Sequence, residues 1–203
     1  MTHIVSIVVD FASNHAGWAY ALAFAVAGFE SFPVLGAVIP GTATIVALAA
    51  LVPEGALSIW PLAAATTAGA IAGDGLSYWL GHSYKDGVVQ MWPLRRNPLL
   101  MEKGQEFFAR HGGKAILIAR FTPGLRAVVP VTAGILGMSV LWFYAVNVLS
   151  ALVWGPSHVG IGIAIGSSFL LLGPSAAGLL GALAVGLFCI VSLAMWAIPR
   201  IIR

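Results

Sequence analysis

Two arginines flank a helix-breaking Pro-Gly pair inside an otherwise apolar stretch, in the order Arg120, Pro123-Gly124, Arg126. A planar guanidinium binds phosphate or carboxylate through parallel N–H bonds, and a turn beside it exposes backbone N–H groups. The pattern therefore predicts a site for an oxyanion. The alternative is that both arginines pair with acidic side chains and only stabilise the fold.

Two acidic residues, Glu30 and Asp74, also lie in or beside apolar segments. A charge inside hydrocarbon costs from about 3 to more than 10 kcal/mol, and such residues usually serve a function. Glu30 is either a protonation switch or a residue that caps a helix start. Asp74 lies in a long apolar helix whose small residues at 69, 73, 77 and 81 share one face, which favours a structural role as partner of an arginine.

The rest of the chain has too little charge for a soluble domain. Only 8% of the 203 residues are charged, against about 25% in an ordinary soluble protein, and 60% are hydrophobic. Residues Ala127–Pro199 include no Asp, Glu, Lys or Arg. Because a spanning helix needs roughly 20 apolar residues, the composition predicts an all-α polytopic membrane protein with four transmembrane helices.

The apolar segments and their interruptions suggest a single membrane domain over residues 1–203. Its expected parts are an N-terminal helix (1–29), a first half with a re-entrant hairpin and a transmembrane helix (30–84), a cytoplasmic amphipathic linker (85–112, helical over Pro98–Arg110), a second half of the same kind (113–168) and a C-terminal transmembrane helix (174–199).

Two segments are too short to cross a bilayer. Ser31–Ile39 and Gly113–Thr122 hold nine and ten residues, so as helices they rise about 14 and 15 Å. Each then meets a Pro-Gly pair, Pro40-Gly41 or Pro123-Gly124, which breaks a helix and permits a sharp turn. We therefore predict two re-entrant hairpins whose tips are buried by protein or line a cavity. The alternative for each is a kinked helix that spans.

Charge placement sets the expected orientation. The segment Lys85–Lys114 has six basic and three acidic residues and should be cytoplasmic. A hairpin at 115–137 then brings Arg200 and Arg203 back to the cytoplasm, and the same reasoning places the N-terminus there too. The two hairpins acquire opposite orientations, in keeping with the Pro-Gly pairs that recur 83 residues apart. Interrupted segments in an inverted repeat are typical of a transporter with a midplane site.

Together these residues resemble the DedA family, the membrane proteins that share the SNARE-associated or VTT domain. The matching pieces are Glu30, Pro40-Gly41, Gly73-Asp74 with Tyr78 and Gly81, Phe108 with His111-Gly112, Arg120-Phe121-Thr122-Pro123-Gly124-Leu125-Arg126, Ala133-Gly134 with Met138, and Trp154.

The resemblance implies a protein of the bacterial inner membrane that moves undecaprenyl phosphate or phospholipid between leaflets, with proton coupling left open. It assigns Arg120 and Arg126 to the lipid phosphate and Glu30 to an essential membrane acid. Many members carry a second acid directly after the first Pro-Gly, where this chain has Thr42. That difference puts proton coupling in doubt. We include Thr42 and Asp74 among the expected substrate-binding residues.

Other function classes find little support. No His or Cys spacing indicates a metal site, no nucleotide-binding loop is present, and no nucleophile–base pair suggests an enzyme. Pro156-Ser157-His158 resembles part of a lipid-phosphatase motif, but residues 127–199 offer no Lys or Arg to hold a phosphate beside it. We expect no cofactor and no nucleic acid, and leave homo-oligomers open. The rival functions are a small-oxyanion transporter and a membrane assembly factor without transport.

Overall fold

A computed structural model describes residues 10–32, 41–85, 87, 98–122 and 125–201, with the side chains at 98, 100–101 and 172–201 outside the description. Within this part every regular element is a helix, which confirms the predicted all-α class. In chain order the helices are α2 (Ala16–Phe29), α4 (Gly41–Ala49), α5 (Ile59–Tyr84), α7 (Pro98–His111), α8 (Lys114–Arg120), α9 (Val129–Ile135) and α10 (Val140–Ile201).

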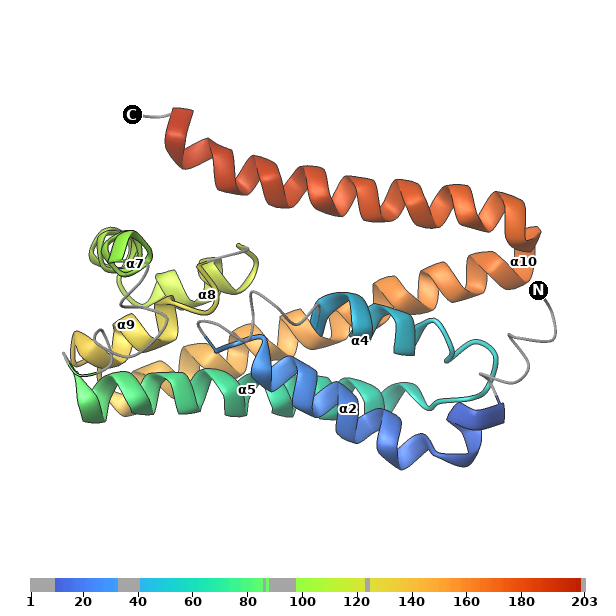
Figure 1. The fold of residues 1–203 in the computed structure, drawn as a ribbon, viewed down its shortest axis with the longest axis horizontal. Coiled ribbons are helices and arrows are strands. Elements are labelled where there is room, and N and C mark those ends of the chain that lie inside the picture. Colours follow the sequence, from blue (N-terminus) through green and yellow to red (C-terminus); the bar gives the residue numbers. More distant parts are fainter. Residues whose placement is uncertain (1–9, 33–40, 86, 88–97, 123–124, 202–203) are drawn as a thin grey trace.

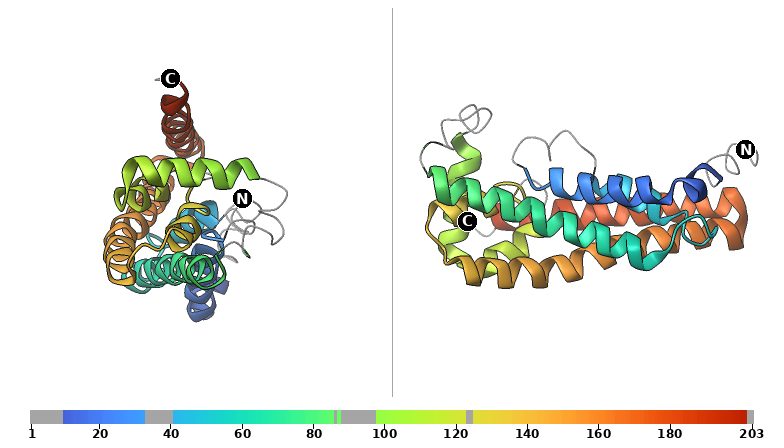
Figure 2. Two further views of the ribbon diagram at one scale, coloured as in Figure 1. Left: turned by 90° about the vertical axis from the view of Figure 1, so that its left-hand side faces the viewer. Right: turned by 90° about the horizontal axis from the view of Figure 1, so that it is seen from below.

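The two long helices, α5 and α10, run in opposite directions along the long axis of the molecule (Figure 1). Helix α10 has 62 residues and would measure about 93 Å if it were straight. It instead folds back, and its second stretch returns toward the end where the helix began (Figures 1 and 2). The sequence predicted such a return between two apolar stretches, with the turn at Leu171–Gly173.

Three helices are much shorter than a bilayer is thick. Helices α4, α8 and α9 have nine, seven and seven residues, which correspond to rises of about 14, 10 and 10 Å. Helix α4 runs from the middle of the molecule to one end, whereas α8 and α9 occupy the other end (Figure 1). Gly41 opens α4, but the predicted breaks at Pro40 and Pro123-Gly124 lie outside the described residues.

Two of the short helices, α4 and α9, pack against the long helix of the other half of the chain, whereas α8 lies on α10 of its own half. Helix α9 lies on α5, and α4 lies on α10. Glycines make both approaches close: a Cβ at Gly81 of α5 or Gly134 of α9 would strike the backbone of the facing helix, and so would one at Gly162 or Gly166 of α10 against α4. In this reciprocal packing, a short helix of each half contacts the long helix of the other half.

The small residues of α5 form the close-packing face that the sequence predicted. Gly69, Gly73, Ser77 and Gly81 are all buried. A Cβ at Gly69 or Gly73 would meet the backbone of α2, while Gly81 faces α9. The small residues of α5 therefore allow both α2 and α9 to approach its backbone closely. Asp74 follows Gly73 directly in the chain.

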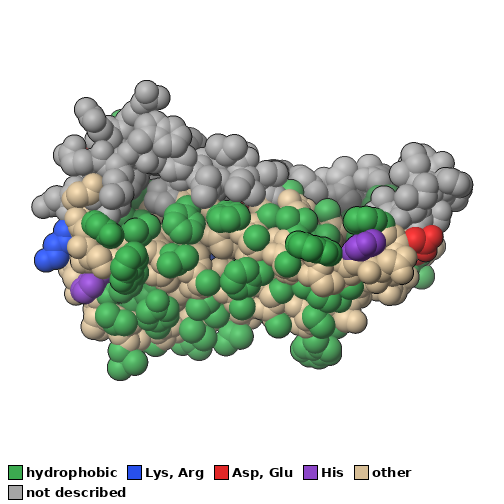
Figure 3. Space-filling model, turned by 60° about the horizontal axis from the view of Figure 1, so that its bottom comes forward, with side chains coloured by type: hydrophobic (Ala, Val, Ile, Leu, Met, Phe, Trp, Pro, Cys, Tyr) green, Lys and Arg blue, Asp and Glu red, His purple; other side chains and the backbone are tan. Residues whose placement is uncertain are grey.

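The surface of the described part is rich in large apolar side chains. Trp18, Trp60, Leu141 and Leu171 are the most exposed, each at more than three quarters of its full area. Figure 3 shows hydrophobic side chains spread across one face, with the charged ones near its two ends. By length and composition, one described helical stretch, Val140–Leu171, can span a membrane; α2 is apolar but has only 14 residues.

The N-terminal helix differs from the prediction. The sequence suggested one N-terminal helix over 1–29, whereas residues 10–14 and α2 are separated by a turn at His15. Asn14 and His15 are weak helix formers, and their side chains bond to the carbonyls of Asp10 and Phe11, four residues earlier. Such local bonds compete with regular helix, which accounts for the break. The predicted amphipathic helix Pro98–Arg110 is confirmed as α7.

Replacing Gly166 by alanine should destabilise the contact between α10 and α4. The new Cβ would lie within 3.0 Å of three backbone atoms of Ala50, and backbone cannot move aside as a side chain can. We expect a cost of about 1–3 kcal/mol, and thus a loss of several degrees in the midpoint of thermal unfolding in detergent micelles. Gly160→Ala is the matched control, since nothing lies within 4 Å of its Cβ. Equal midpoints for the two variants would contradict the described contact.

Candidate functional site

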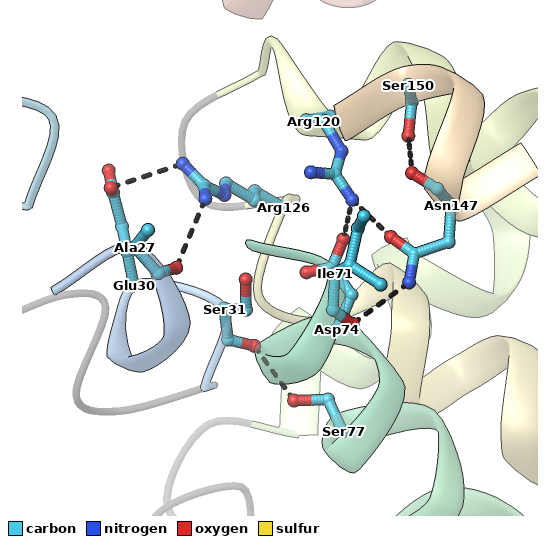
Figure 4. A network of polar contacts seen from close by, with 10 residues as sticks. All are labelled: Ala27, Glu30, Ser31, Ile71, Asp74, Ser77, Arg120, Arg126, Asn147 and Ser150. Carbon is cyan, nitrogen blue, oxygen red and sulfur yellow. Dashed lines mark hydrogen bonds and ion pairs between the residues drawn. The ribbon is translucent and has the colours of Figure 1, made fainter. Parts of the chain in front are cut away.

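Polar and charged side chains gather between the ends of the short helices, inside the apolar body of the protein (Figure 4). Asp74 lies 15 residues after the start of α5 and 10 before its end, or about 22 and 15 Å along the helix. Glu30 follows α2, Arg120 ends α8, and Arg126 lies in the turn before α9. Elements that are distant in sequence thus place four charges in one region, beside the middle part of α5.

Arg120 is the more deeply buried of the two arginines, with 3% of its surface exposed. Its Nη2 donates to Oδ2 of Asp74 and to the amide oxygen of Asn147. The amide nitrogen of Asn147 in turn donates to the carbonyl of Ile71 at 3.1 Å, and its own carbonyl accepts from Ser150 Oγ at 2.9 Å. This pair is therefore fixed by two helices, α5 and α10, and the predicted arginine partner of Asp74 is confirmed.

Arg126 is held differently. Its Nη1 lies 3.2 Å from Oε2 of Glu30, and its Nη2 donates to the carbonyl of Ala27 at 3.5 Å. The guanidinium carbon stands 3.9 Å above the ring centroid of Trp154, which is a cation–π distance. The hydroxyl of Thr42 donates to Oε1 of Glu30 at 2.6 Å. Glu30 is thus shared between an arginine and a hydroxyl.

The turn between α8 and α9 uses its own backbone donors. The N–H groups of Leu125 and Arg126 both donate to the carbonyl of Thr122, at 3.2 and 3.3 Å. The Pro123-Gly124 pair suggested that backbone N–H groups in this turn help to bind an anion. That expectation is wrong for these two residues, because the turn is closed by their own hydrogen bonds; Pro123-Gly124 lie outside the described residues.

Several donors and acceptors of this network lack a hydrogen-bond partner among the described residues. They are Nε and Nη1 of Arg120, Nε of Arg126, Oδ1 of Asp74, Oγ of Ser31 and Oε2 of Glu30, the last of which is ion-paired without an aligned hydrogen bond. Buried polar groups are normally satisfied, so three guanidinium nitrogens without a hydrogen-bond partner among the described residues distinguish this region from the rest of the buried interior.

Each expected site residue can now be placed. Glu30, Thr42 and Arg126 meet in one cluster, and Asp74 and Arg120 in the neighbouring one. The pairing that the structural alternative required is therefore present, and the described charges sum to zero: two guanidiniums against two carboxylates. Substrate binding by these residues remains a proposal, developed below.

Sequence reasoning assigned no role in the site to Asn147 or Trp154, and it placed Ser77 only on the packing face of α5. Ser77 Oγ donates to the carbonyl of Ser31 at 2.9 Å and ties α5 to the end of α2. Asn147 offered a signal, because it is a strongly polar residue in a charge-free apolar run, and such residues face the interior of a bundle. Trp154 was noted only as a matching residue, since nothing in its sequence neighbourhood indicates an arginine above its ring.

The chain was compared with known proteins. The family model of the VTT domain matches residues 39–164. The inner membrane protein YabI of Escherichia coli (strain K12) is 34% identical over 143 residues, which are 70% of this chain and 56% of YabI. Inner membrane protein YghB of the same organism is 30% identical over 90% of this chain and 86% of YghB, and protein DedA is 29% identical over 75% and 71%.

The matched part is a little over half of the length of YabI, so the activity of a whole relative is not carried over as a fact. No solved structure matches the chain. The VTT model covers well over half of the 203 residues, including Arg120, Arg126 and Asp74. The chain therefore belongs to the VTT-domain family of DedA membrane proteins.

Proposed function

We propose that this protein is a transporter that moves an anionic lipid, either undecaprenyl phosphate or a phospholipid, between the two leaflets. Arg126 and Arg120 hold the lipid phosphate. The observation that carries the proposal is the burial of two guanidiniums near mid-depth with three N–H donors that no described residue uses. Donors in that position suit a phosphate that passes through the middle of the bilayer.

The proposed orientation follows from the ends of the molecule. Lys85, Lys103, Arg110 and Lys114 lie at the end formed by α7, so this end is cytoplasmic. The second stretch of α10 returns toward the same end, in agreement with a cytoplasmic C-terminus (Figure 1). The described chain starts at Asp10 at the opposite end. We therefore place Asp10 outside in this proposal; the predicted cytoplasmic N-terminus concerns residues 1–9, which lie outside the described residues.

In this orientation α8 and α9 form a hairpin that opens inward, and we propose that α4 belongs to one that opens outward. With the long helices, these would be the two halves of the predicted inverted repeat. The names of YabI and YghB place those proteins in the inner membrane, and we propose the bacterial inner membrane for this chain as well. The reciprocal packing of α4 on α10 and of α9 on α5 supports a pair of equivalent halves around one site.

The contacts suggest how a phosphate enters. Glu30 occupies one edge of the Arg126 guanidinium, so an arriving phosphate competes with that carboxylate for the same donors. Thr42 keeps its bond to Glu30 and holds the displaced side chain near the site. Arg120 contributes Nε and Nη1 while Asp74 and Asn147 fix its Nη2.

One observation favours the assembly-factor alternative. Both arginines already have carboxylate partners, as a purely structural role requires. The unused N–H groups count against it, since a network built only for stability gains nothing from leaving donors unpaired. A small oxyanion would use the same donors as a lipid phosphate, so the transport assay must include both.

The test is translocation in liposomes that contain the purified protein, with labelled polyprenyl phosphate, phospholipid and inorganic phosphate as separate probes. Arg126→Ala should reduce transport about 10- to 150-fold, the equivalent of losing charged hydrogen bonds worth about 1.5–3 kcal/mol. Arg110→Ala is the control, because the side chain of that arginine is 62% exposed and its ion pair joins it to Glu106 on the surface of α7.

An unchanged rate in Arg126→Ala would reject the site. If inorganic phosphate were transported and neither lipid were, the substrate would be a small oxyanion and not a lipid. No protein-dependent transport of any probe would favour the assembly factor.

A further inference from the structure

One buried titratable group has no part in the site described so far. His158 of α10 is 3% exposed. Its Nδ1 lies 2.8 Å from the carbonyl of Trp154, four residues earlier, and its ring lies against that of Trp154 with centroids 4.5 Å apart. A carbonyl oxygen only accepts, so Nδ1 carries the hydrogen of the neutral ring, and Nε2 is the nitrogen that can take a second proton.

The same local geometry occurs twice more without burial. His15 and His111 each place Nδ1 3.0 or 2.9 Å from the carbonyl four residues earlier, and each ring lies 4.4 Å from that of Phe11 or Phe107. Both of these histidines are exposed. The bond and the ring contact are therefore ordinary helix-surface features, and the distinguishing property of His158 is its position inside the site.

The surroundings of His158 contain the second ion pair. Trp154 lies next to His158 and also carries the guanidinium of Arg126 on its ring. Through Trp154, His158 is therefore connected with the ion pair of Arg126 and Glu30. Of the helices packed on α10, α4 has no charged residue, and Asp74 of α5 and Arg120 of α8 are bonded to each other.

The charge balance of the site requires a compensating proton. Two arginines and two carboxylates sum to zero, so a bound monoanion leaves an excess negative charge in a water-poor environment, which is costly. Before the anion binds, the charges of the site balance with a neutral imidazole. Once the anion covers Arg126 and displaces Glu30, a cationic imidazole is favoured instead.

We propose that His158 accepts a proton from water on Nε2 when an anionic headgroup binds at Arg126, and so supplies the titratable group that Thr42 does not. The inference rests on the proposed anion site and adds a defined proton acceptor to it. It assigns proton coupling to α10 rather than to the segment after the first Pro-Gly pair. Anion uptake is then accompanied by proton uptake even where a carboxylate at position 42 is missing.

The experiment measures protons taken up per anion bound. The probe is dihexyl phosphate, a phosphodiester that stays a monoanion at neutral pH, so any proton must go to the protein. Titration calorimetry of the full chain in nanodiscs, in two buffers of different ionisation enthalpy at pH 7.5, gives the proton count. We expect His158→Asn to lower that count by about one, while His111→Asn leaves it at the wild-type value.

Equal proton counts in wild type and His158→Asn would overturn the inference and leave the proposed site intact. Failure of the wild type to bind the diester more tightly than Arg126→Ala would remove the site itself, and the inference with it. Should His158→Asn not fold, a protein with His3, His15, His82 and His111 replaced by Asn retains one histidine. Its ¹⁵N imidazole signals must then move from the neutral to the cationic pattern when the diester is added at constant pH, and unmoved signals refute the proposal.

Discussion

Asp74→Asn should destabilise the protein by about 3–5 kcal/mol, the usual cost of removing one partner from a buried ion pair. Arg120 would keep its charge among buried neighbours, with the amide of Asn147 as its remaining side-chain partner among the described residues. The measurement is chemical or thermal unfolding of the purified protein in detergent, together with the yield of folded protein from membranes.

The exposed pair Arg110–Glu106 is the matched control. It joins the same kinds of side chain at 2.7 Å but is largely solvent-exposed. Glu106→Gln should therefore cost less than about 1 kcal/mol. The double variant Asp74→Asn with Arg120→Gln removes the stranded charge and should recover much of the stability without restoring transport. If Asp74→Asn proved as stable as Glu106→Gln, the buried pair would not hold the two halves together.

Exchanging the partners of the second pair, by Glu30→Arg with Arg126→Glu, should keep the protein folded but reduce lipid transport at least tenfold. A pair that only stabilises the fold tolerates reversal, whereas a phosphate site loses its guanidinium from the ring of Trp154. Liposome transport and unfolding of the exchanged protein, compared with Glu30→Arg alone, provide the measurement. Full transport by the exchanged protein would show that this pair is purely structural.

Arg126→Lys tests the same point with a smaller change. Lysine keeps the charge that Glu30 needs but loses the planar fork and the stacking on Trp154. We expect stability close to that of the wild type and a reduction of transport of about tenfold. A wild-type rate in this variant would mean that charge alone, without bidentate geometry, recognises the transported anion.

Much of the helical framework was predictable because it depends on local pattern. Helix α7 begins at Pro98 as predicted, since proline suits a first helical turn and the apolar face that follows is periodic. The stripe of small residues on α5 also identified a packing face correctly. The start of α2 was harder to predict. Its break at His15 results from a hydrogen bond between the His15 side chain and a backbone carbonyl, which competes with regular helix in an otherwise apolar segment.

The site was predictable only in its residue types. Buried arginines need carboxylate partners, which the sequence could name, but which arginine pairs with which acid depends on how α5, α8 and α10 pack. Asp74 lies 46 residues from Arg120, and Glu30 lies 96 residues from Arg126. The positions of Trp154 under Arg126 and of His158 beside it follow from the same packing, so no local signal could have revealed them.

The reciprocal packing of the two halves has a consequence for synthesis on the ribosome. Helix α4 ends at Ala49, yet Gly162 and Gly166, which receive it, are made more than a hundred residues later. At about 5–20 residues per second, the first hairpin must wait roughly 6 to 23 seconds for the helix that covers it. During that interval the face of α4 that later meets Gly162 and Gly166 has no helix of the second half to pack against.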